Sequence, residues 1–255
     1  MQNGVFRVGT SFDKPKQRQL VVEIEGTSSL TAIALRERIV SSQVIHIFGA
    51  GLNAERPAHT AVAELSSRGW ACAPVHPRDA GGSISGFPIR PSLDSGVLPE
   101  IVVLFLAPER ARAVVRDLIM SLSHDDAFPL IWFQRGAQDA PSIEALESMG
   151  APFVVNDCIV EYTNRNGYHC AQSPLPQSFC LQIASEDGDG CSVWSVHSTK
   201  DASLARPTHA LEWVGTLGEL ECSHHTIPRY IRSLQNDGEA LDALALRLSH
   251  SQVMM

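Results

Sequence analysis

The sequence predicts a doubly wound α/β fold, in which helices cover both faces of a parallel sheet, with a smaller α+β domain added to it. Between residues 43 and 165, short apolar runs alternate with segments of helical periodicity, which is typical of parallel βαβ units. From residue 179 onward, apolar and polar residues alternate instead, as in antiparallel strands. We therefore expect an N-terminal strand and helix over residues 1–42, the α/β domain over 43–168, and the α+β domain over 169–255.

The first half of the α/β domain contains two strands and one helix. The apolar run Val44–Phe48 forms the first strand. A helix begins at Pro57, a residue favoured in the first turn, and continues with apolar residues at helical spacing until Gly69 ends it. The run Trp70–Val75 forms the second strand, and a loop rich in Gly and Ser follows it.

The second half continues the same alternation. The unbroken apolar run Ile101–Ala107 predicts a strand with both faces covered. Residues 108–123 carry one apolar stripe and form a helix, and residues 130–134 and 152–157 are strands on either side of a short helix at 141–150.

The residues on either side of the α/β domain predict further strands and helices. Near the N-terminus we expect a strand at 18–26 and a helix at 28–42. The C-terminal part reads as four antiparallel strands, with a Gly/Asp-rich turn after the first and a turn at "TLGEL" before the fourth, and then two helices. The strands are expected at 179–185, 192–198, 209–217 and 219–227, and the helices at 228–235 and 238–250. The N-terminal strand is a candidate to join this C-terminal sheet.

Composition excludes several classes of partner. The net charge of −8 argues against nucleic acid, whose phosphates require a basic face. The chain has neither an apolar run of the roughly 20 residues that a membrane span needs nor a signal-peptide core, so we expect a cytoplasmic protein without a membrane partner. The six cysteines form no C-x-x-C motif and are interpreted as reduced, buried residues.

A Gly-rich turn follows the first strand and points to a phosphate. Gly49–Gly51 precedes a helix N-terminus, so backbone N–H groups and the helix dipole face this position. Arg56 can add a charge-assisted contact. Because position 54 is Ala, the G-x-G-x-x-G motif is incomplete and an ordinary strand–helix turn stays an alternative. After the second strand, where NAD enzymes carry an acidic residue, the sequence has Arg78, which suits the extra ribose phosphate of NADP or coenzyme A.

Several separated blocks agree in order with a known family. They are Gly49-Ala50, Arg56-Pro57, Pro74-Val75 with Pro77, Gly86, Pro91-Ser92, Pro108-Glu109, Trp132-Phe133-Gln134 with Gly136, and Asp157-Cys158. Over about residues 43–165 the chain resembles the CoA-binding domain family, Rossmann-like proteins similar to the N-terminal domain of the succinyl-CoA synthetase α subunit. Two positions depart from it: Gly51 stands where Ser is common, and His76 where the family has Asn.

The resemblance implies a set of cofactor-binding residues, grouped by the part of coenzyme A or acyl-CoA that they would contact. The diphosphate would be contacted by Gly49, Ala50, Gly51, Arg56 and Pro57. The adenine and ribose would be contacted by Val75, His76, Pro77 and Arg78, and the pantetheine by Ala107, Pro108, Gln134, Arg135 and Gly136.

The catalytic residues are left open. Cys158 follows the end of a strand and could meet the CoA sulfur or accept an acyl group, or else pack as a structural residue. Asp157 and Glu161 could orient a substrate or cap the junction between strand and helix. On the expected strand Cys222 and His224 share a face and His225 points away, so we expect no metal site there.

We expect a protein that binds coenzyme A or acyl-CoA, with the extra domain recognising or processing the acyl group. Whether it is an enzyme stays open; if it is, acyl transfer or acyl-CoA processing is the expected class. The alternatives are an NADP-linked oxidoreductase that uses the same site and a non-catalytic CoA-sensing subunit of a larger acyl-transfer complex. A homodimer and a larger acyl-transferring partner protein both stay open.

Overall fold

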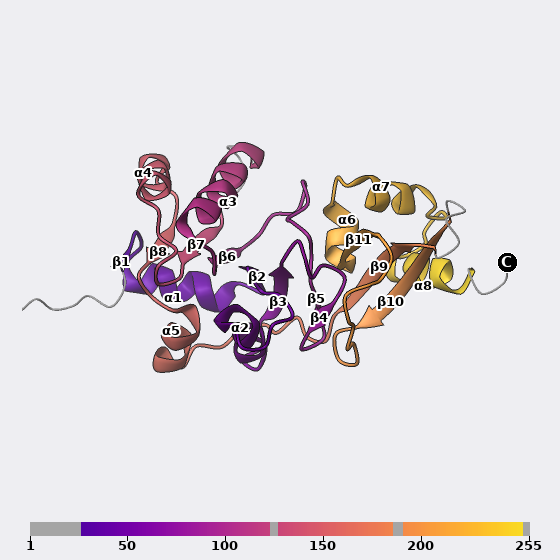
Figure 1. Ribbon diagram of the computed structural model, residues 1–255, viewed down its shortest axis with the longest axis horizontal. Coiled ribbons are helices and arrows are strands. Elements are labelled where there is room, and N and C mark those ends of the chain that lie inside the picture. The colour runs from indigo at the N-terminus through magenta and orange to yellow at the C-terminus, as the bar shows by residue number, and fades with distance from the viewer. Residues whose placement is uncertain (1–26, 123–126, 186–190, 252–255) are drawn as a thin grey trace, which may run out of the picture.

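The structure is a computed structural model that describes residues 27–122, 127–185 and 191–251. It consists of two lobes side by side, a larger one built on a parallel sheet and a smaller one built on an antiparallel sheet (Figure 1). The strand expected at 18–26 and the Gly/Asp-rich turn at 186–190 lie outside the described residues.

The larger lobe contains a six-stranded sheet with the order β1-β8-β7-β6-β2-β3. Five of its strands are parallel, and the two-residue β1 (Thr27–Ser28) runs antiparallel to β8 at the edge. The parallel strands are β2 (Val44–Phe48), β3 (Ala71–Val75), β6 (Ile101–Leu104), β7 (Leu130–Phe133) and β8 (Phe153–Val155). The chain passes from β2 outward to β3 and then returns to β6 on the other side of β2. This reversal is the point at which open α/β sheets bind ligands.

Helices cover both faces of this sheet, as the sequence predicts for a doubly wound fold (Figure 1). One face packs against α1 (Ala32–Ser41), α2 (Pro57–Ser66) and α5 (Ile159–Asn166). The other packs against α3 (Pro108–Ser121) and α4 (Ala140–Met149). Leu35 and Ile39 place α1 in the core of the larger lobe, so this N-terminal helix packs on the parallel sheet. The limits of the three expected domains stay predictions.

The loop after β3 contains a small hairpin that the sequence analysis did not anticipate. It pairs β4 (Ser83–Ile84) with β5 (Phe87–Pro88), and Gly86 in its turn has φ +85°. A Cβ at Gly86 would lie 1.7 Å from the carbonyl oxygen of Thr199 in the smaller lobe. Glycine is therefore required both for the turn and for the close approach of the two lobes.

The smaller lobe confirms three of the four expected antiparallel strands and both expected helices. Its sheet has the order β10-β9-β11, formed by β9 (Ser178–Ala184), β10 (Ser192–Ser198) and β11 (Leu211–Thr216). Three helices pack on it: α6 (Leu217–Cys222), α7 (Thr226–Ser233) and α8 (Leu241–Ser251). The rings of Trp194 and Trp213 stack in the core with their centroids 6.0 Å apart.

The fourth expected strand, at 219–227, is wrong: this segment forms α6 and the start of α7. A capping box explains the helix. The Thr216 hydroxyl accepts from the backbone N–H of Glu219 at 3.3 Å, and the Glu219 carboxylate accepts from the N–H of Thr216 at 2.7 Å. "TLGEL" is therefore a helix start rather than a turn, and the alternation in "ELECSHH" does not reflect a sheet face. Cys222 ends α6, and the His225 side chain caps α7.

The two lobes are joined by buried polar contacts. Arg90, in the loop after β5, donates from Nε to the carboxylate of Glu219 in α6 at 2.5 Å, and their side chains are 4% and 13% exposed. The Asp94 carboxylate accepts from Trp213 Nε1 at 2.9 Å and from the Ser223 hydroxyl at 2.7 Å. These contacts fix the segment 91–98 of the larger lobe against the smaller lobe. Among the described helices, none has the length and hydropathy to cross a membrane.

Candidate functional site

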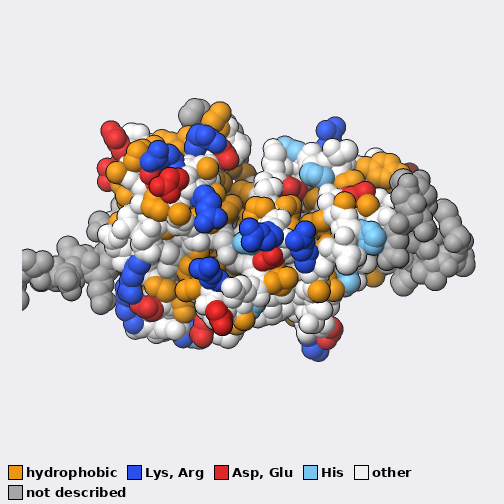
Figure 2. Space-filling view, in the orientation of Figure 1, with side chains coloured by type: hydrophobic (Ala, Val, Ile, Leu, Met, Phe, Trp, Pro, Cys, Tyr) orange, Lys and Arg blue, Asp and Glu red, His pale blue; other side chains and the backbone are white. Residues whose placement is uncertain are grey.

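A cavity of about 1590 Å³ opens at the carboxyl ends of β2, β3, β6 and β7, where the strand order reverses. Figure 2 shows the surface hollowed between the two lobes, where hydrophobic and basic side chains lie next to one another. The structure brings most of the sequence-predicted cofactor residues to this cavity. Those in its lining are Gly49, Gly51, Arg56, Pro57, Val75, His76, Pro77, Arg78, Gln134, Arg135 and Gly136. Ala50, Ala107 and Pro108 are not among the lining residues.

The turn after β2 approaches its neighbours so closely that its first residue must be glycine. Gly49 has φ +94° and donates its N–H to the Val75 carbonyl at 2.9 Å. A Cβ at this position would lie 2.4 Å from the carbonyl oxygen of Phe105, so a side chain does not fit. The turn leads to Arg56, the N-cap residue of α2, whose side chain makes no capping hydrogen bond, and Pro57 follows in the first turn. The start of α2 is thus available to an anion.

An unexpected carboxylate lies on this turn. Asp79 accepts from the N–H of Leu52 at 2.8 Å and lies 3.2 Å from Nδ1 of His76. A Cβ on Gly51 would come within 2.3 Å of the same carboxylate. The absent side chain at Gly51 therefore makes room for Asp79. The sequence does not indicate this contact, because His76, Pro77 and Arg78 separate Asp79 from the end of β3.

Three arginines surround the cavity without partners. Arg56, Arg78 and Arg110 all line it and are exposed. Within the part of the chain that the structure describes, their side chains make no hydrogen bond or ion pair. Arg110 lies in the first turn of the helix that follows β6, near the sheet mouth as its sequence position indicates, but it was not assigned to a part of the ligand. Together the three side chains provide positive charge for an anionic ligand.

The turn after β7 provides an unpaired donor. Gln134 is 5% exposed, and its Nε2 has no hydrogen-bond partner among the described residues. A buried amide nitrogen without a partner is costly, so its position beside the cavity suits a ligand carbonyl. Gly136 has φ +83° and Arg135 pairs with Glu161 at 2.8 Å.

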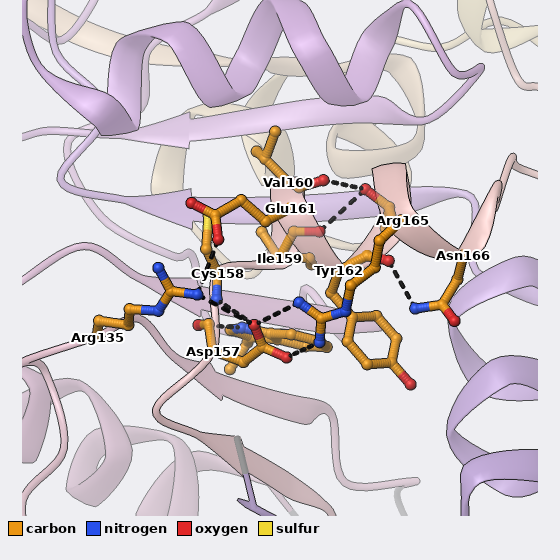
Figure 3. Close-up of polar contacts among 11 residues, drawn as sticks. Arg135, Asp157, Cys158, Ile159, Val160, Glu161, Tyr162, Arg165 and Asn166 are labelled. Atoms are coloured by element: carbon orange, nitrogen blue, oxygen red, sulfur yellow. Dashed lines mark hydrogen bonds and ion pairs between the residues drawn. The ribbon is translucent and has the colours of Figure 1, made fainter. Parts of the chain in front are cut away.

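The candidate catalytic residues Asp157, Cys158 and Glu161 are not among the residues that line the cavity. Arg135 and Arg165 approach the buried Asp157 carboxylate from opposite sides (Figure 3), and the N–H of Cys158 donates to it at 2.8 Å. These contacts give Asp157 a structural task at the start of α5. Glu161 is occupied by Arg135, and Cys158 is the N-cap residue of α5. Their catalytic roles stay predictions.

Other titratable groups are held in inert forms by burial. Burial raises the pKa of the Cys72 thiol and raises that of Cys180 to about 12, so both stay protonated. Burial, opposed by the charge of Glu219 and helped by that of Arg90, lowers the pKa of His46 to about 4. In the described ranges, no three His, Cys, Asp or Glu side chains come together as metal ligands. Of the Cys222–His225 segment, His224 lines the large cavity.

Residues 43–163 match the model of a family described as a CoA binding domain. No curated protein matches the chain. A protein redesigned for binding, Prb, is similar at 24% identity over 57% of this chain and 96% of its own, with a TM-score of 0.47. Cell-free ID.343 from Thermus thermophilus shows 25% identity over 53% and 98%, with a TM-score of 0.48. A hypothetical protein from Pyrococcus horikoshii OT3 shows 25% identity over 53% and 92%, with a TM-score of 0.46.

Proposed function

We propose that residues 43–163, a CoA binding domain by their match to that family, hold coenzyme A or acyl-CoA in the large cavity, and that the smaller lobe recognises or processes the acyl group. The observation that carries this proposal is the combination of the glycine turn at the switch point with three arginines around it that have no partner among the described residues. A diphosphate is favoured by a helix N-terminus and by nearby positive charge, and this cavity has the start of α2 and the arginines together.

The cavity residues suggest how the parts of the ligand are held. The diphosphate binds the turn that contains Gly49 and the start of α2, with Arg56 beside it. Arg78, exposed after β3, takes the ribose phosphate that distinguishes CoA from NAD. Gln134 donates its unpaired Nε2 to an amide carbonyl of the pantetheine arm.

A dinucleotide is the second candidate, because the Asp79 carboxylate on the Gly turn resembles the acidic group that binds ribose hydroxyls in NAD enzymes. NADP-linked oxidation is less well supported, because none of the described residues that line the cavity is a lysine. Lys200, the lysine that the structure describes, lies in the smaller lobe and does not line the cavity. No Tyr–Lys pair for hydride chemistry is therefore present among the described residues.

Calorimetric titration with CoA, dephospho-CoA, NAD and NADP tests the proposal. We expect CoA to bind most tightly, and Arg78→Gln to weaken CoA binding about tenfold while leaving dephospho-CoA unaffected, as loss of one charge-assisted contact predicts. Arg36→Gln, which removes an exposed arginine on α1, is the matched control. Absence of CoA binding at millimolar concentration contradicts the proposal, and preferred binding of NAD supports the second candidate.

The reaction, if there is one, is a separate question. The proposed CoA site fits acyl transfer or acyl-CoA processing, and it also fits a non-catalytic CoA-sensing subunit. Incubation of the purified protein with acyl-CoA, followed by thiol release, distinguishes these possibilities. Copurification of a second chain without thiol release supports the sensing subunit, and a homodimer is tested by light scattering.

A further inference from the structure

The large cavity has an apolar half that a nucleotide does not explain. Its volume of about 1590 Å³ exceeds the roughly 300–1,000 Å³ of most small-molecule sites. The polar half lies at the strand ends, beside the Gly turn. The apolar half lies between α3 and the segment 91–98, and we call it the acyl groove. Its apolar lining consists of Leu93, Val97, Leu98, Ala113, Val114, Leu118 and Leu122.

The two carboxylates beside the acyl groove already accept hydrogen bonds. Asp94 accepts from Trp213 Nε1 and from the Ser223 hydroxyl. Asp117 is 67% exposed and accepts from Arg116 at 3.0 Å. Arg110, one turn before Val114 on α3, also lines the cavity and is counted with its polar half. Along the rest of the groove both carboxylates would repel an anionic ligand group. The groove therefore suits an uncharged hydrocarbon chain.

The smaller lobe holds one wall of the groove in place. Ser95 accepts a backbone hydrogen bond from His224 at 2.7 Å, beside the two contacts of Asp94. A Cβ on Gly96 would lie 2.4 Å from the carbonyl oxygen of Cys222, so glycine permits the closest approach of the wall to the smaller lobe. Leu93 of this wall packs against the same apolar cluster as α3, whereas Leu98 stays 54% exposed at the cavity.

We propose that the acyl groove receives an uncharged acyl chain of medium length, attached to the CoA that the polar half holds. This inference rests on the proposed function. The groove follows α3 from Ala113 to Ser121, which is about 12 Å of helix. An acetyl group would leave most of this length empty, whereas a medium chain covers it and buries Leu98. The smaller lobe selects the acyl group by setting the width of the groove.

Calorimetry with CoA, succinyl-CoA and octanoyl-CoA on the full chain tests this inference. We expect octanoyl-CoA to bind at least about tenfold more tightly than CoA, because each buried methylene adds to the affinity. Succinyl-CoA, with its charged end, is expected to bind no more tightly than CoA. Val114→Trp fills the groove and Leu98→Asp charges it, so each variant should lose the octanoyl preference and keep its affinity for CoA. Met120→Trp, on the same helix but 78% exposed and outside the groove, is the control.

The two proposals fail in different ways. If none of the three ligands binds, the proposed function is wrong and this inference with it. If CoA and octanoyl-CoA bind equally well, or if both groove variants keep the full octanoyl preference, the acyl groove alone is wrong. Thermal unfolding of each variant shows whether it is folded, and Leu98→Asp changes an exposed side chain, so it decides the matter if Val114→Trp does not fold.

Discussion

The ion pair between the lobes gives the sharpest prediction of stability. Glu219→Gln keeps the shape of the side chain but removes the charge opposite Arg90, which is 4% exposed. Burial alone would raise the pKa of Glu219, but the charge and hydrogen bonds of Arg90 outweigh it and lower that pKa. Both charges are therefore present at neutral pH, and the variant leaves a buried guanidinium uncompensated.

The expected loss is about 3–5 kcal/mol of unfolding free energy, the usual cost of removing one partner of a buried pair. Urea unfolding measures it, with the fluorescence of Trp194 and Trp213 reporting on the smaller lobe. Glu161→Gln is the control, since it breaks the pair with Arg135 in which both side chains are more than half exposed, and it should cost less than about 1 kcal/mol.

A second substitution separates the loss of the pair from other effects of the change. Arg90→Met combined with Glu219→Gln should recover at least about 2 kcal/mol relative to Glu219→Gln alone, because the double variant no longer leaves a buried guanidinium without a counter-charge. The reasoning is refuted if Glu219→Gln costs no more than the Glu161→Gln control, or if the double variant is less stable than the single one.

Three further predictions concern the larger lobe. The unfolded imidazole of His46 takes up a proton as the pH falls through its ordinary 6.5, whereas the buried one stays neutral to about 4. The free energy of unfolding should therefore fall over this range by up to about 3 kcal/mol. Urea unfolding at several pH values measures this fall, and His46→Phe should remove the part of it that His46 causes. Gly49→Ala should destabilise the protein by about 2 kcal/mol or more and abolish CoA binding, whereas Gly136→Ala, with nothing within 4 Å of the new methyl group, should cost about 1 kcal/mol by thermal unfolding. Asp79→Asn should tighten CoA binding a few-fold in calorimetry at low salt by removing a negative charge from the Gly turn, and an unchanged affinity would mean that Asp79 does not face the diphosphate.

The parallel sheet could be predicted from the sequence because its signals are local. Each buried strand is a short apolar run, and proline or glycine marks where α2 begins and where its predicted pattern ends. The Gly turn was predicted for the same reason, since Gly49 directly follows its strand. The failure at 219–227 has the opposite cause: α6 begins through side-chain hydrogen bonds between Thr216 and Glu219, and hydrophobic periodicity does not detect them.

The remaining features depend on contacts between distant residues. Arg90 stands in an apolar stretch, and its burial is explained by Glu219, 129 residues later in the chain. The hydrogen bond from the N–H of Leu52 to the Asp79 carboxylate likewise depends on the path of the loop after β3.

Segment 91–98 couples the large cavity to the smaller lobe because it contacts both. Its side chains line the large cavity, and Asp94, Ser95 and Gly96 contact the smaller lobe. A ligand that buries Leu98 must therefore favour the arrangement in which Asp94 stays bonded to Trp213 and Ser223. The coupling is reciprocal: the free energy by which the ligand strengthens these contacts is also the free energy by which their loss weakens binding of the ligand. Asp94→Ala should thus reduce the affinity for octanoyl-CoA more than the affinity for CoA, although Asp94 belongs to the polar attachment of the groove wall and not to its apolar lining. Equal losses for the two ligands in calorimetry would show that the smaller lobe does not set the groove.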